Sequence, residues 1–127
     1  MDFNREIEEA YFNLYNFWNG GRMLESKYQR TLIVELKHRF PGCIVLKNDA
    51  NYLQGFPDLL VLHHDKWAAF EVKASMNSAE QANQAYYVKL LANMSFAAFI
   101  CPENEEDVLD ALQHAFQPRR PTRVPKR

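Results

Sequence analysis

The chain has 127 residues, 47% of them hydrophobic and 24% charged, with a formal net charge of −1. This length and composition favour one globular domain with a single core. The longest apolar runs are far too short for a membrane span, and the acidic, polar N-terminus differs from a secretory signal. We therefore expect a cytoplasmic protein without a membrane partner.

The first twenty residues predict a helix that is rich in aromatic side chains. Apolar residues recur at helical spacing from Phe3 to Trp18, and Gly20-Gly21 ends the pattern. Six of the seventeen aromatic residues lie in this segment, which is more apolar surface than one short helix usually needs for docking. We expect residues 1–20 to be an extension that packs on the core or, alternatively, joins a partner subunit.

The rest of the chain predicts an α/β domain that ends near residue 117. In chain order we expect a helix over 22–40, a strand over 43–47, a polar loop over 48–56, two strands of a hairpin within 55–73, a helix from Ser78, a strand over 96–101 and a helix over 103–116. Ser78 suits the N-cap of its helix, which puts Gln81 at the third helical position, the place of a capping box. A strand–helix–strand crossover in this order is typical of a mixed sheet flanked by helices.

The last ten residues, 118–127, carry five basic residues and no acidic one, so the rest of the chain has a net charge of −6. A basic end that is interrupted by prolines, on an acidic body, predicts a flexible arm that contacts polyanions. A tail that only aids solubility is the alternative. The basic residues are Arg119, Arg120, Arg123, Lys126 and Arg127.

The predicted hairpin contains charged residues that are costly in an apolar setting. If its two strands turn about His64 and Asp65, residues whose numbers sum to 129 lie opposite each other, which pairs Asp58 with Glu71. Lys73 points to the same side as Glu71, because side chains alternate along a strand. Three charged groups therefore converge on one patch.

Two carboxylates this close favour a cation between them, and oxygen ligands suit Mg²⁺ or Mn²⁺. A hard divalent metal beside a lysine is suited to hydrolysis of a phosphodiester. A structural Lys–Glu pair with an incidental aspartate is the alternative. Gly55 and Pro57 bend the backbone before Asp58, and this costs stability, which favours a functional site.

Several short motifs occur together in this chain: Glu25 with Gln29 one helical turn later, Gly55-x-Pro57-Asp58, Glu71-Val72-Lys73, and Gln81 in "SAEQ". Together they resemble the virus-type replication-repair nuclease family (VRR-NUC) of the PD-(D/E)xK nuclease superfamily. The resemblance runs from about residue 25 to residue 112. It implies a restriction-endonuclease-like core, in agreement with the α/β order above.

The resemblance implies a DNA endonuclease that depends on Mg²⁺ or Mn²⁺. It implies that Asp58, Glu71 and the Val72 carbonyl bind the metal and that Lys73 is catalytic. Glu25 would complete the acidic cluster, directly or through water.

Two positions leave alternatives. Glu35 is the competing helical acid, and it lies about 80° around the helix from Glu25, so both cannot face the site equally; we prefer Glu25. Gln81 would line the site beside the lysine, although its capping position is a sufficient structural reason for it.

Small stand-alone members of the family, often from phages, resemble dimeric resolvases of branched DNA. This implies a homodimer acting on Holliday junctions or flaps, in the host cytoplasm if the protein is phage-encoded. The competing hypothesis is a catalytically silent nuclease fold that binds nucleic acid or another protein. The polar and aromatic loop before the hairpin adds candidate contacts to phosphates or an unpaired base, or it is an ordinary surface loop. Its candidates are Lys47, Asn48, Asn51 and Tyr52.

Overall fold

The structure is a computed structural model, and it describes residues 5–7, 24–118 and 125–126. Residues 5–7 are helical. The rest of the predicted N-terminal extension and most of the basic tail lie outside the described residues. The longer described elements are α2 (Glu25–Arg39), β1 (Ile44–Lys47), β2 (Leu59–His63), β3 (Lys66–Val72), α3 (Ala82–Met94), β4 (Phe96–Ile100) and α4 (Glu105–Ala115).

The four strands form one mixed sheet in the order β1-β2-β3-β4. β1, β2 and β3 pair antiparallel, whereas β3 and β4 are parallel and joined through α3. The predicted α/β class and the predicted order of elements from the 22–40 helix onward are confirmed. Within the described segments, no helix is long and apolar enough to traverse a bilayer.

The hairpin register that was predicted from the sequence is confirmed. Leu59 lies opposite Phe70 and His63 opposite Lys66, so paired residue numbers sum to 129. His64 has a φ of 56°, the left-handed conformation that tight hairpin turns require. The same register, extended by one residue, places Asp58 opposite Glu71 at the open end of the hairpin, where Asp58 Oδ2 accepts a hydrogen bond from the Val72 N–H.

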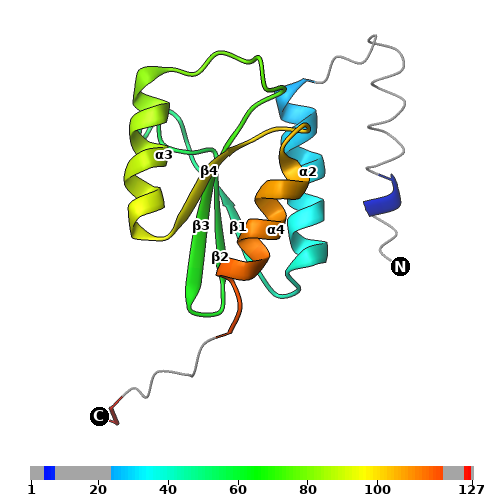
Figure 1. Ribbon diagram of the computed structural model, residues 1–127, viewed down its shortest axis with the longest axis vertical. Helices are drawn as coiled ribbons and strands as arrows, with labels where there is room; N and C mark the ends of the chain where they lie inside the picture. Colours follow the sequence, from blue (N-terminus) through cyan, green and yellow to red (C-terminus); the bar gives the residue numbers. More distant parts are fainter. Residues whose placement is uncertain (1–4, 8–23, 119–124, 127) are drawn as a thin grey trace.

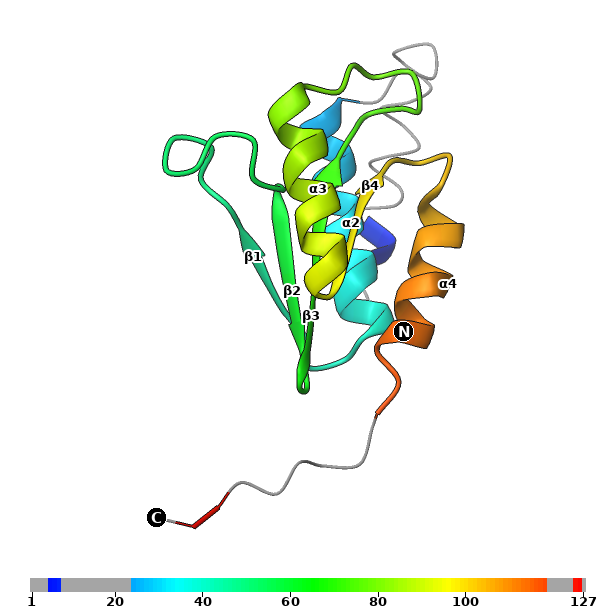
Figure 2. The ribbon, with the colours of Figure 1, turned by 60° about the vertical axis from the view of Figure 1, so that its left-hand side comes forward.

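Helices cover the sheet on both sides, with α2 and α4 on one face and α3 on the other (Figure 1; Figure 2). The main core lies between α2, α4 and the sheet. Fully buried leucine side chains each contribute about 1.5–3 kcal/mol to such a core. Its largest completely buried members include Leu32, Leu36, Phe70, Leu109 and Leu112.

The predicted start of α3 is wrong by three residues. Ser78 does not cap the helix; its Oγ accepts a hydrogen bond from the Ser75 backbone N–H at 3.1 Å, inside a separate turn. The N-cap is Gln81, whose backbone N–H donates to Oε1 of Gln84 at 3.1 Å. Because the Ser78 hydroxyl is used locally, the capping arrangement moves one turn along the chain.

Candidate active site

The candidate site lies at the end of the sheet where β3 ends and where α2 and α3 begin (Figure 1). Glu25 is the first residue of α2, Asp58 immediately precedes β2, and Glu71 is the penultimate residue of β3. Lys73 follows β3 directly, and its backbone N–H donates to the Ile100 carbonyl at 2.8 Å. The start of α2 therefore positions Glu25, and the paired strands β2 and β3 position Asp58, Glu71 and Lys73.

Asp58 is fixed by the backbone around it. Its Oδ2 accepts a hydrogen bond from the Val72 N–H at 2.8 Å, across the hairpin. Its own carbonyl accepts from the Asn48 N–H at 2.9 Å, and the Asn48 side-chain amide donates to the Pro57 carbonyl. Asn48, which the sequence predicted as a DNA contact, thus holds the loop that presents Asp58.

Glu71 is the most unusual group of the site. Its side chain is buried, with 3% of the residue exposed, and its Oε2 finds no hydrogen-bond partner among the described residues. Burial, and then the neighbouring Asp58 carboxylate, raise the pKa of Glu71 to about 8. Such an orphaned buried oxygen is costly unless a proton or a cation satisfies it.

Lys73 is a buried cation with an identified partner. Only 9% of the residue is exposed, and its Nζ donates to Oε1 of Gln84 at 2.8 Å. The ammonium charge of Lys73 lowers the pKa values of both Glu25 and Glu71, in opposition to burial and to Asp58. The lysine is therefore held within electrostatic reach of the acids by one glutamine.

The residue that contacts Lys73 is Gln84, which the sequence did not single out. Gln81, which was predicted beside the lysine, is exposed and begins the helix. The two glutamines are one helical turn apart. The signal for Gln84 was present, because a capping box that starts at Gln81 has Gln84 as its third helical residue.

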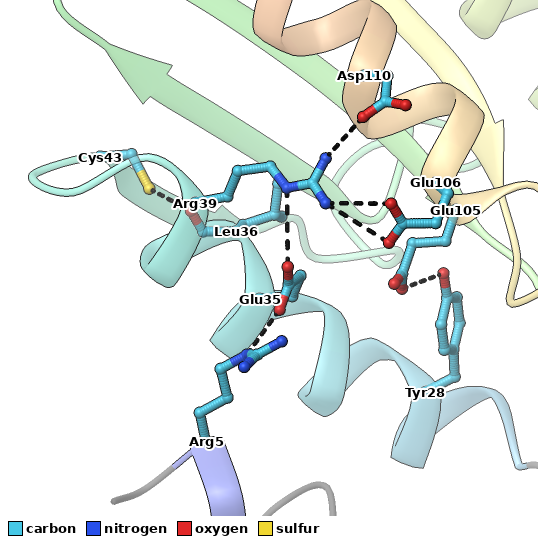
Figure 3. Close-up of polar contacts among 9 residues, drawn as sticks. All are labelled: Arg5, Tyr28, Glu35, Leu36, Arg39, Cys43, Glu105, Glu106 and Asp110. Carbon is cyan, nitrogen blue, oxygen red and sulfur yellow. Dashed lines mark hydrogen bonds and ion pairs between the residues drawn. The ribbon is translucent and has the colours of Figure 1, made fainter. Parts of the chain in front are cut away.

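The structure separates the two competing acids of α2. Glu25 lies at the rim, where partial burial and then Asp58 raise its pKa and Lys73 lowers it. Glu35 lies elsewhere, bound to Arg5 at 2.7 Å and to Arg39 at 3.7 Å (Figure 3). Only Glu25 of this pair is placed to join Asp58, and its role as a ligand stays a prediction.

Asp58 and Glu71 are the carboxylate donors available for the predicted metal. In the part of the chain that the structure describes, no three or more His, Cys, Asp or Glu side chains form a ready-made metal site. The pair Asp58 and Glu71 offers oxygen donors, one of them the orphaned Oε2, and hard cations prefer such ligands. These residues fit Mg²⁺ or Mn²⁺, with Val72 as the predicted main-chain ligand.

The predicted DNA contacts lie in two parts of the chain, the end of β1 with the segment that follows it, and the C-terminal tail. Lys47 ends β1, and Asn51 lies in an exposed turn where its N–H binds Oδ1 of Asp49 at 2.8 Å. Tyr52 is 89% exposed on the same loop. In the tail, Lys126 is described and exposed, whereas the four arginines lie outside the described residues.

Of the predicted site residues, the structure brings Asp58, Glu71 and Lys73 together, and Glu25 lies within electrostatic range of Asp58 and Lys73. No family model, curated protein or solved structure matches the chain.

Proposed function

We propose that this protein is a divalent-metal-dependent DNA endonuclease of the PD-(D/E)xK type, related to VRR-NUC. One observation carries the proposal: the buried Glu71, with one orphaned carboxylate oxygen, is coupled to the half-buried Asp58 and lies beside the buried ammonium group of Lys73. An acid pair and a lysine at the end of adjacent strands are the groups that metal-assisted phosphodiester hydrolysis needs.

Asp58 and Glu71 would hold Mg²⁺ or Mn²⁺, with the Val72 carbonyl, and Glu25 would join them directly or through water. When bound, the cation supplies Lewis-acid activation of the scissile phosphate and of water. The buried Lys73 ammonium stabilises negative charge that develops on the phosphate, in a site where low exposure strengthens the interaction.

The substrate class we propose is branched DNA, such as a Holliday junction or a flap, cut by a homodimer in the cytoplasm. Tyr52 supports this class, because an aromatic ring that is 89% exposed is available to stack on an unpaired base. The basic tail would add phosphate contacts that do not depend on base sequence.

The test is a cleavage panel of linear, flapped and four-way DNA with Mg²⁺ or Mn²⁺. We expect the wild-type chain to cut branched DNA, and Asp58→Asn to reduce the single-turnover rate by about 10²-fold or more. Glu25→Gln should lower the rate, whereas Glu35→Gln, on the same helix but in another network, should not. Wild-type protein that binds DNA but cuts no substrate with either metal would favour the catalytically silent module.

A further inference from the structure

One face of the sheet is only partly covered by the described helices. α3 packs on β3 and β4, whereas β1 and β2 extend beyond it (Figure 2). Val45 and Val61 face the core on the α2 side, so the alternate residues face the other side. There Ile44, Leu46 and Leu62 are 56%, 44% and 36% exposed, and Ile44 pairs with Leu62.

α3 adds a second row of exposed apolar side chains. Tyr86, Leu90 and Met94 recur every four residues, which aligns them along the helix, and they are 61%, 36% and 63% exposed. The Phe56 ring packs on Tyr87 with centroids 5.5 Å apart, which brings the loop before β2 against α3. The exposed residues of the strands and of α3 together are called the apolar face: Ile44, Leu46, Leu62, Tyr86, Leu90 and Met94.

The elements of the apolar face are poor in charge. α3 has one charged residue, Lys89, in 13 positions, and β1 and β2 have one, Lys47. The helices on the other side of the sheet differ, because α2 carries six Asp, Glu, Lys or Arg residues and α4 carries four. Depletion of charge together with exposed apolar and aromatic side chains is characteristic of the centre of a protein interface.

We infer that the apolar face is the contact surface of a homodimer. In a two-fold dimer the same patch meets itself, and a patch that is nearly free of charge does so without opposing like charges. The inference does not depend on nuclease activity.

The chain's own N-terminal segment is the competing occupant. Residues 8–23 start after Arg5–Ile7, where Arg5 binds Glu35 of α2 (Figure 3), and they end at Leu24, which precedes α2. Both ends of the segment are therefore on the α2 side of the sheet, opposite the apolar face. This geometry favours a second copy of the chain.

Sedimentation equilibrium of the full chain tests the inference with a matched pair of variants. Met94 and Met76 are both 63% exposed, but only Met94 belongs to the apolar face. We expect a wild-type dimer, a dissociation constant raised at least tenfold by Met94→Glu, and no change with Met76→Glu. Circular dichroism and urea unfolding of each variant establish that a loss of dimer is not a loss of fold.

Benzoylphenylalanine in place of Tyr86 gives an independent readout. Ultraviolet cross-linking to a second chain, at peptides from β1, β2 or α3, supports the inference. A cross-link to residues 8–23 of the same chain, a wild-type protein that is monomeric at every concentration tested, or equal dimer strength for Met94→Glu and Met76→Glu would overturn it.

Discussion

Glu71 combines burial, a neighbouring carboxylate and an oxygen without a partner among the described residues. In the unfolded chain a glutamate titrates near about 4.3, whereas in the folded chain the pKa of Glu71 is about 8. Between these values the folded chain holds a proton that the unfolded chain has released. The free energy of unfolding of the metal-free protein therefore falls as pH rises through this window.

This shift predicts a pH dependence that a cation removes. In the presence of a chelator, the urea midpoint of the wild-type chain should fall between about pH 5 and pH 8, and Glu71→Gln should reduce this slope because it removes the titrating group. Mn²⁺ at the higher pH should restore much of the wild-type midpoint, since the cation replaces the proton. Equal pH slopes for the wild-type chain and Glu71→Gln would contradict the assignment.

Lys73 and Gln84 give a second prediction at the scale of the residue. Gln84→Ala removes the 2.8 Å contact that holds the ammonium group, so we expect single-turnover cleavage to fall on the order of tenfold, as for a hydrogen bond to a charged group. Gln81→Ala changes the same helix end without touching Lys73 and should leave the rate nearly unchanged. The cleavage rate measured across pH separates a role of Gln84 in positioning Lys73 from a role in stability. Equal losses of rate in both variants would indicate that Gln84 has a structural role alone.

At the scale of the element, the loop before β2 is held against α3 at Gly55. This residue has a φ of +85°, and a Cβ there would lie 2.5 Å from Cγ of Asn83. Gly42 has nearly the same φ, +86°, but nothing within 4 Å of a Cβ. The two glycines therefore separate backbone strain from steric overlap.

We expect Gly42→Ala to lower the free energy of unfolding by about 1–2 kcal/mol, the cost of a left-handed conformation for a residue with a Cβ. Gly55→Ala should cost more, and the added Asn83→Ala substitution should recover part of the difference, as measured by urea unfolding. If both substitutions lowered the free energy of unfolding equally, the close approach of Gly55 to α3 would make no contribution to stability.

How much the sequence predicts also differs between elements. The hairpin register was predictable because local turn chemistry at His64 fixes it, and with it the opposition of Asp58 and Glu71. The start of α3 was not, since the Ser78 hydroxyl binds a nearby turn instead of the helix. The choice of Gln84 over Gln81 followed from that shift.

At the scale of the whole molecule, the position of α3 over β3 and β4 exposes the apolar face, and no local pattern in the strands predicts this. The acids of the candidate site do not belong to that face. A dimer formed through it would carry two separate sites, as cutting two strands of a branched DNA requires.

The basic tail gives a prediction at this scale. Removal of residues 118–127 should weaken DNA binding at low salt and reduce the slope of log affinity against log salt by about 0.9 for each lost phosphate contact. The rate of cleavage at saturating enzyme should change little, because the site lies within residues 25–84. If the affinity for DNA at low salt did not change, the tail would have a role other than DNA binding.

We propose that Asp58 and the buried Glu71 hold the cation that drives cleavage. The most direct test is a Mn²⁺ titration of four-way junction cleavage by the wild-type chain and by Glu71→Gln, with folding checked by circular dichroism. We expect a saturable Mn²⁺ dependence for the wild-type chain and little or no cleavage by the variant. Cleavage by Glu71→Gln at the wild-type rate and with the same Mn²⁺ dependence would contradict it.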